Sequence, residues 1–213
     1  MKHRFIKTAL ALSIAAASTT ALADNRFHKP FWPQKKDAYF ERVATFPVYE
    51  NLNLSTGDAL DDSTSAEISA ASKDGNVVFY SDSPMERIGL IDIKDVANPK
   101  PAGFIALDGE PTSVAVNGNY LLVAVNTSSS FTTPGGKLSI YTLDNPHQPQ
   151  WLVDYDLAGQ PDAIAVSPDG RYAAIVIENE RDEDLNHGII PQLPAGNLQI
   201  LSMRQEPGQW QMR

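Results

Sequence analysis

The stretch "DAIAVSPDGRYAAIVIEN", Asp162–Asn179, contains two apolar segments separated by a short polar turn. Its Pro-Asp-Gly suits a tight turn, because glycine adopts positive φ angles without a steric penalty. Two earlier stretches have the same design, "AEISAASKDGNVVFYSD" at Ala66–Asp82 and "TSVAVNGNYLLVAVN" at Thr112–Asn126. The shared pattern of strand, glycine turn and strand indicates an internal repeat.

Each repeat continues with further apolar segments. The third position holds "RIGLIDI", "KLSIYTL" and "NLQILSM", and the fourth holds "PKPAGFIALDGEP" and "PQWLVDYDLAGQP". The equivalent residues Ile68, Val114 and Ile164 are 46 and 50 residues apart. Four short antiparallel strands at such a period are typical of β-propeller blades. A β-sandwich is the alternative, but the internal repetition favours the propeller because sandwiches need not repeat.

The number of repeats predicts an all-β fold that is an incomplete β-propeller. About three blades are expected, each a four-stranded antiparallel sheet, whereas closed propellers typically have roughly four to eight. The third unit is expected to reach Arg213 within its fourth strand. "ERVATFPVYENL", Glu41–Leu52, resembles the fourth strands but lacks three preceding ones. It is therefore expected to be a strand that completes the last blade.

The N-terminus has the three parts of a signal peptide. Lys2, Arg4 and Lys7 are basic, an apolar run follows at residues 9–17, and Ala-Leu-Ala at residues 21–23 has the pattern of a cleavage site. The apolar run is too short to span a membrane, and a buried N-terminal helix would not explain all three parts. The sequence predicts a periplasmic or secreted protein, cleaved after Ala23.

This interpretation divides the chain into a signal peptide (1–23), an extended lead-in segment (24–39) and a partial propeller (40–213). Cleavage would remove three positive charges and no negative one, so the formal charge would change from −9 to −12. An acidic chain is a poor partner for nucleic acid or anionic membranes, but it is compatible with cations. The chain has no cysteine, which excludes disulfides, thiolate metal ligands and a thiol nucleophile.

The loops between second and third strands lengthen along the chain. They read "SDSPME", "NTSSSFTTPGG" and "ENERDEDLNHGIIPQLPAG", which are 6, 11 and 19 residues long. In a propeller these loops share one face with the loops that enter each first strand. Insertions concentrated on one face indicate a functional face.

The carboxylates expected at this face are candidate ligands for Ca²⁺, a hard cation that takes about six to eight oxygen ligands. The candidate metal ligands are Glu67, Glu110, Asp162, Glu178, Glu180, Asp182 and Asp184. Their spacing does not match an EF-hand loop. The alternative is a solvated acidic loop, neutralised by Arg181 or by water. Ser128–Ser130 lacks the glycines of a nucleophile elbow, so the sequence indicates no serine nucleophile.

"DGEPTSVAV", "GQPDAIAVSPDGRYAAIVIENERDED" and "PQLPAG" resemble the N-terminal propeller region of bacterial exported phytase-like, esterase-like proteins, often labelled alkaline phosphatases. More broadly, the repeats are similar to YVTN/lactonase-like and LVIVD-type propellers. The resemblance covers roughly residues 40–203, and IENERDED followed by the Pro-Gln-x-Pro-Ala-Gly stretch is its most specific part. Members of the family are longer, with a phytase-like segment after these repeats.

The resemblance implies that this chain is the propeller part of an exported phosphate-ester hydrolase and is not catalytic by itself. No catalytic residue is carried over. A small phosphate ester, held through bound cations, or another small ligand is the implied partner. The alternative is a non-enzymatic periplasmic or secreted module for binding or scaffolding. In either case, missing blades or self-association are expected to cover the ends of the partial propeller.

Overall fold

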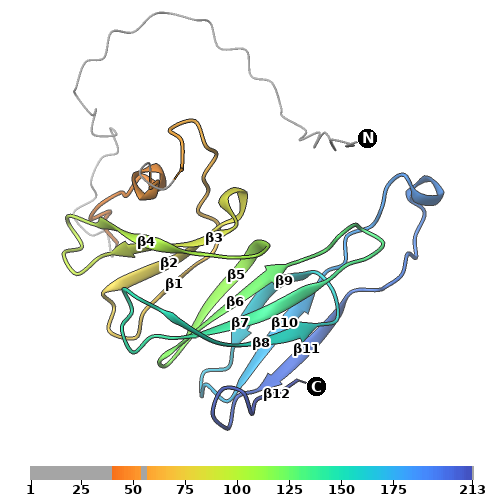
Figure 1. Cartoon of the computed structure of the whole chain (residues 1–213). Helices are drawn as coiled ribbons and strands as arrows, with labels where there is room; N and C mark the ends of the chain where they lie inside the picture. The colour runs from red at the N-terminus through yellow and green to blue at the C-terminus, as the bar shows by residue number, and fades with distance from the viewer. Residues whose placement is uncertain (1–39, 54–56, 213) are drawn as a thin grey trace, which may run out of the picture. The chain divides into compact units, whose positions relative to one another are not determined.

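Twelve strands occupy the part of the chain that the computed structural model describes, residues 40–53 and 57–212 (Figure 1). The predicted signal peptide and lead-in segment lie outside these residues. Blade 1 consists of β1 (Ser69–Ala71), β2 (Val77–Asp82), β3 (Arg87–Asp92) and β4 (Lys100–Ala106). Blade 2 consists of β5 (Glu110–Asn117), β6 (Tyr120–Asn126), β7 (Gly136–Thr142) and β8 (Gln150–Leu157). Blade 3 consists of β9 (Pro161–Val166), β10 (Tyr172–Ile177), β11 (Asn197–Ser202) and β12 (Gln211–Met212).

All neighbouring strands within each blade pair antiparallel, in sequence order. The first strands of successive blades are neighbours, β1 beside β5 and β5 beside β9, so the blades fan out from one axis. This arrangement confirms the predicted all-β fold of about three four-stranded blades. Among the described residues, no helix has the length and apolar character needed to cross a membrane.

Each blade has two faces, because successive side chains of a strand point to opposite sides. We call the face that points toward the next blade along the chain the forward face, and the opposite one the backward face. The first core layer joins the forward face of blade 1 to the backward face of blade 2. Its buried side chains are Val77, Phe79, Ile88, Leu90, Val114, Leu121, Val123, Val125, Tyr141 and Leu143.

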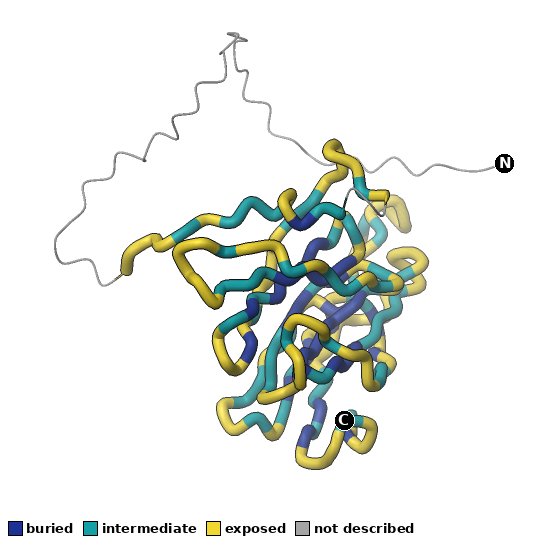
Figure 2. Tube along the Cα trace, turned by 60° about the vertical axis from the view of Figure 1, so that its left-hand side comes forward, coloured by how far each residue is buried: buried dark blue, intermediate teal, exposed yellow. Residues whose placement is uncertain are grey.

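The second core layer joins the forward face of blade 2 to the backward face of blade 3. Its buried side chains are Leu122, Leu138, Ile140, Leu157, Ala173, Ile175, Ile177, Leu201, Met203 and Trp210. Figure 2 shows the buried residues along the strands and the exposed ones mostly at the turns. Blade 2 is therefore covered on both faces, and burial of its aliphatic side chains stabilises the whole stack.

The strand predicted for Glu41–Leu52 is absent, and this part of the prediction was wrong. The segment contains only a short 3-10 helix, η1 (Val48–Asn51). Instead of adding a backbone ladder, the segment inserts the side chain of Asn51 between β3 and β4. Pro47 precedes η1 and has no N–H to donate to a ladder.

Candidate functional site

Three loops and the entries to the first strands lie at the same end of the blades. In blade 1, η2 (Ser83–Met85) connects β2 to β3, and the Ser83 hydroxyl donates to the Pro111 carbonyl oxygen at 2.9 Å and contacts Glu67 at 3.0 Å. In blade 3, the Glu178 N–H donates to the Gln160 carbonyl at 2.9 Å. These contacts bring the second-to-third-strand loops of blades 1 and 3 to the start of β5 and to the loop that enters β9, at the end of the blades that the repeat predicts.

The long loop, residues 178–196 between β10 and β11, is held by its own polar side chains. The Gln192 amide accepts the Asp182 N–H at 2.9 Å and donates to the Asp182 carbonyl at 2.9 Å. At the base, Asn179 accepts the Gln160 N–H at 2.9 Å and donates to the Ala195 carbonyl at 3.2 Å. The loop is therefore a shaped element, pinned at its base and across its middle.

Large aliphatic side chains project from this ordered loop into solvent. Their exposed fractions are 49% for Leu185, 58% for Ile189, 68% for Ile190 and 81% for Leu193. We call these four residues the apolar tip. A cavity of about 130 Å³ beside the tip is lined by Phe131, Asn179, Glu180, Arg181, Ile190, Gln192, Leu193, Pro194, Ala195 and Gly196. Phe131 comes from the loop of blade 2, so two blades contribute to this surface.

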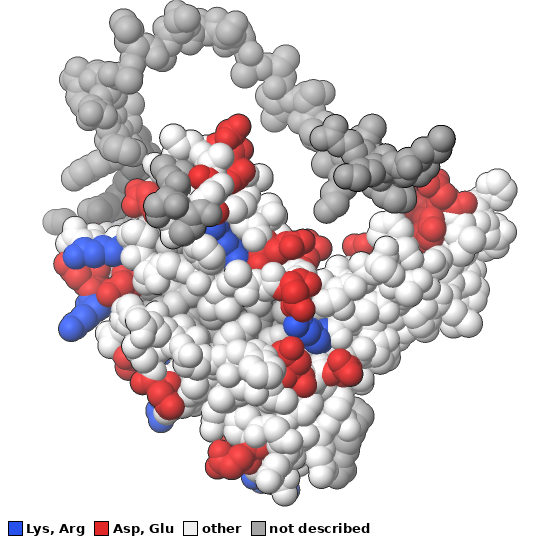
Figure 3. Space-filling view, in the orientation of Figure 1, with Lys and Arg blue, Asp and Glu red and all other residues white. Residues whose placement is uncertain are grey.

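The predicted carboxylate ligands lie at the loop face but do not converge. Glu67 contacts Ser83, Glu110 begins β5, and Asp162 lies exposed in β9. Asp182 accepts the N–H groups of its own loop, those of Asp184 and Leu185. Across the residues described, no group of three or more His, Asp or Glu side chains is placed to hold a metal ion. Figure 3 likewise shows acidic side chains in several separate groups.

The predicted neutralising residue of the acidic run makes one ion pair. Arg181 contacts the carboxylate of Glu183 at 3.3 Å, and it also donates to the Gly188 carbonyl at 3.2 Å. Both side chains of this pair are more than half exposed. Exposed ion pairs of this kind contribute little to stability.

Sequence analysis did not identify Arg87 and Lys137, two cations at equivalent positions of the repeat. They are the first residues of "RIGLIDI" and "KLSIYTL". In blade 2, Lys137 lies 2.6 Å from an Asp108 oxygen and 3.2 Å from an Asp154 oxygen. Burial alone would lower the pKa of Lys137, but the bonds to Asp108 and Asp154 outweigh it and raise the pKa. The shared position in the repeat was the signal that could have identified both residues.

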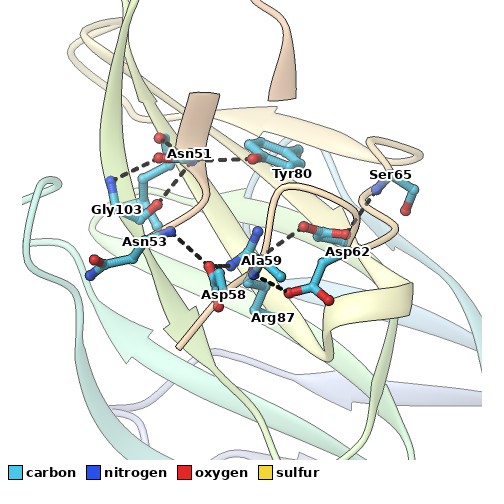
Figure 4. A network of polar contacts seen from close by, with 11 residues as sticks. Asn51, Asn53, Asp58, Ala59, Asp62, Ser65, Tyr80, Arg87 and Gly103 are labelled. Carbon is cyan, nitrogen blue, oxygen red and sulfur yellow. Dashed lines mark hydrogen bonds and ion pairs between the residues drawn. The ribbon is translucent and has the colours of Figure 1, made fainter. Parts of the chain in front are cut away.

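The equivalent cation of blade 1, Arg87, is almost completely buried. Its side chain is 3% exposed, and it bonds the Asp82 carboxylate at 3.0 Å. It also bonds Asp58 at 2.9 Å (Figure 4). The guanidinium also lies 4.8 Å from the centre of the Phe104 ring. We call Arg87, Asp82 and Asp58 the polar clamp. It attaches the segment that precedes blade 1 to the backward face of that blade.

Asn51 makes a second attachment on the same face (Figure 4). Its amide nitrogen donates to the Tyr80 hydroxyl at 3.1 Å, to the Leu90 carbonyl at 2.9 Å and to the Gly103 carbonyl at 3.1 Å. Its amide oxygen accepts the Gly103 N–H at 3.2 Å. The pairing of β3 with β4 is irregular between Gly89 and Ile91, and the Asn51 amide satisfies backbone groups at this irregularity.

Acid should loosen the polar clamp. The hydrogen bond from the Asn53 N–H, together with the Arg87 guanidinium, holds the pKa of Asp58 below its usual value. A carboxyl whose pKa is lower in the folded state stabilises the fold fully above its unfolded pKa, about 3.9, and loses this contribution as the pH falls further. We expect Asp58→Asn to lose less stability than the parent between pH 7 and pH 3. Urea unfolding at both pH values measures this, and equal losses would contradict it.

Comparison with known proteins places most of the propeller in one family. The family model described as "Choice-of-anchor I domain" matches residues 67–212, which covers all three blades. It is not described as a phytase-like or alkaline phosphatase family, so that finer assignment remains a hypothesis. A search of curated proteins found no match.

Several solved structures overlap with part of the chain. Hydrazine synthase of Kuenenia stuttgartiensis is 12% identical over 64% of this chain and 34% of its own, with a TM-score of 0.46. The periplasmic gluconolactonase PpgL of Pseudomonas aeruginosa is 15% identical over 70% and 41%, with a TM-score of 0.47. Sqt1 of Saccharomyces cerevisiae is 10% identical over 71% and 35%, with a TM-score of 0.49. The chain thus spans 34–41% of the length of each of these three proteins, and overlaps of this size carry no information about activity.

Proposed function

The chain belongs to the choice-of-anchor I domain family, and from that premise we propose that it is a non-catalytic β-propeller module that binds a protein partner through its loop face. Membership of this family indicates a surface or exported protein, which agrees with the signal peptide predicted for residues 1–23. The role that we propose for the fold is to present the long loop, residues 178–196, on a rigid stack of blades.

The observation that supports this proposal is the apolar tip on an ordered loop. Four large aliphatic side chains stay in water although Gln192 and Asn179 hold the loop in shape. Exposed apolar side chains that gather on one surface mark interaction sites, and Ile190 and Leu193 of the tip line one cavity together with Phe131. Glu178 and Glu180 belong to the same loop as the tip. The partner that fits best therefore has an apolar groove with a basic rim.

Binding to cell-envelope proteins of the producing organism tests the proposal. We expect the double variant Ile190→Ser/Leu193→Ser to bind at least about tenfold more weakly than the parent, because two apolar contacts are removed. Leu60→Ser/Val96→Ser is the matched control, since these side chains are 79% and 56% exposed but lie outside the long loop. Equal binding by the parent and the tip variant would contradict the proposal.

The finer hypothesis, a propeller that belongs to an exported phosphate-ester hydrolase, comes from the sequence resemblance alone. Release of p-nitrophenol from p-nitrophenyl phosphate by the purified chain, with and without calcium, separates the two functions. We expect no release above the buffer control. Release that disappears when the rim carboxylates Glu178 and Glu180 are changed to glutamine would support the hydrolase instead.

Calcium binding at the loop face stays a prediction from the sequence, because it requires rim carboxylates to move toward one another. If such a site forms, calcium at a hundred times its Kd would stabilise the fold by about 2.7 kcal/mol. Melting curves in millimolar calcium and in chelator measure this effect, and Asp182→Asn should reduce it. Identical melting midpoints would favour the solvated acidic loop.

A further inference from the structure

The loop of blade 2 between β6 and β7, residues 127–135, is an ordered element like the long loop of blade 3. The Ser128 hydroxyl accepts the Gly135 N–H at 3.0 Å and donates to the Gly135 carbonyl at 3.2 Å. A turn closes its apex, where the Thr133 N–H donates to the Ser130 carbonyl at 3.1 Å. Phe131 lies within this turn and is 52% exposed. The fold thus presents an aromatic side chain to solvent from an ordered turn.

The cavity of about 130 Å³ that Phe131 lines together with the long loop has both apolar and polar side chains in its walls, and we call it the socket. Its apolar side chains are those of Phe131, Ile190, Leu193, Pro194 and Ala195. Pockets for drug-sized ligands measure about 300–1,000 Å³, whereas a cavity of about 150 Å³ holds a single benzene ring. The socket therefore has room for one side chain of a partner rather than for a whole small ligand.

Three of the four polar side chains at the socket already have partners. Asn179 and Gln192 bond backbone groups, and Arg181 is paired with Glu183. The fourth, Glu180, is exposed and takes part in none of the ion pairs between described residues. The surrounding run, residues 178–184, adds four further carboxylates against one arginine, so its field also favours a cation. A positively charged group is therefore the complement of this socket.

We infer that the socket receives one arginine side chain of a partner protein. The inference rests on the proposed function, and the arginine belongs to the basic rim of that partner. An arginine combines an aliphatic stem, which packs on Ile190 and Leu193, with a guanidinium that pairs with the Glu180 carboxylate. The planar guanidinium also stacks on aromatic rings, and Phe131 supplies one. A purely apolar side chain would leave Glu180 unpaired, and a lysine has no plane to stack.

Three short peptides that differ only in their central residue, arginine, lysine or norleucine, test this inference. Amide shifts of residues 127–135 and 178–196 during titration give the dissociation constants. We expect the arginine peptide to bind about fivefold more tightly than the norleucine peptide, because an exposed ion pair and a ring contact each add a few-fold at most. The lysine peptide should lie between them. Equal binding of all three, or of the arginine and lysine peptides, would overturn the inference.

Two variants locate the effect. Phe131→Ala and Glu180→Gln should each weaken binding of the arginine peptide by about threefold, since each removes one of the two contacts to the guanidinium. Tyr49→Ala is the matched control for the aromatic change, because Tyr49 is 60% exposed and does not line the socket. Unchanged binding by both variants would contradict the assignment of the arginine to this socket.

Binding to cell-envelope proteins separates this inference from the proposed function. If Ile190→Ser/Leu193→Ser loses the partner while Phe131→Ala/Glu180→Gln keeps it, the apolar tip binds the partner and no arginine occupies the socket. If the arginine peptide binds as expected but the tip variant still retains the envelope proteins, the socket selects arginine and the proposed role of the tip is wrong.

Discussion

Replacing Leu138 by alanine should lower the free energy of unfolding by about 2–5 kcal/mol, the cost of a buried leucine truncated to a cavity. Leu138 is completely buried between blades 2 and 3, where it belongs to the second core layer. The surrounding sheets are held by their ladders, so they can close only part of the space. The effect should therefore lie well above that of a surface substitution.

The control for this prediction is built into the repeat. Leu198→Ala changes the same residue type at the equivalent position of blade 3, where the side chain is 59% exposed. We expect a change of no more than about 0.5 kcal/mol in the monomeric chain. Urea unfolding of both variants and the parent measures the difference. Comparable losses at the two positions would mean that blade 3 is covered in solution or that blade 2 is not.

Truncating Arg87 should be as costly, for an electrostatic reason. Arg87→Ala leaves the completely buried carboxylate of Asp82 without its ion-pair partner. Breaking a buried pair by removal of one member costs about 3–5 kcal/mol, because the remaining charge is desolvated and uncompensated. The Phe104 ring also loses the guanidinium that packs on it. We expect the segment at residues 57–65 to lose amide protection together with the fall in global stability.

Two further variants separate charge from packing. Arg87→Met/Asp82→Leu removes the fully buried pair and leaves only Asp58, which is 16% exposed, without its cation. It should recover part of the loss, because replacing a buried pair by apolar residues is often tolerated. Arg171→Ala breaks an exposed pair with Asp169 and should leave the unfolding midpoint almost unchanged. A double variant that is less stable than Arg87→Ala would show that the stranded charge is not the main cost, because loss of the hydrogen bond from the Ser65 N–H to Asp82 would then outweigh it.

The sequence alone determined the architecture of this protein, because its signals are local and repeated. The stretch Asp162–Asn179 predicted two strands around a glycine turn, and the structure has β9 and β10 there with Gly170 at a positive φ of 67°. Alternating apolar residues identify strands wherever one face is buried, and three copies of the pattern identified the blades. The lengths of the loops also predicted which blade carries the largest extension.

Tertiary structure decided what covers each blade. Asn51 and Asp58 contact blade 1 across 39 and 29 residues, to Leu90 and Arg87, and their own neighbours in the sequence do not predict these partners. Glu41–Leu52 was predicted to be a strand because it resembles the fourth strands of the repeats. Such a resemblance does not show whether a segment pairs its backbone with a sheet or only contacts the sheet through a side chain, as Asn51 does. Leu138 and Leu198 are the clearest case, since the repeat makes them equivalent and only the presence of a neighbouring sheet makes one buried and the other exposed. Burial depends on what packs against a residue, and a repeat sequence specifies the residue without specifying that neighbour.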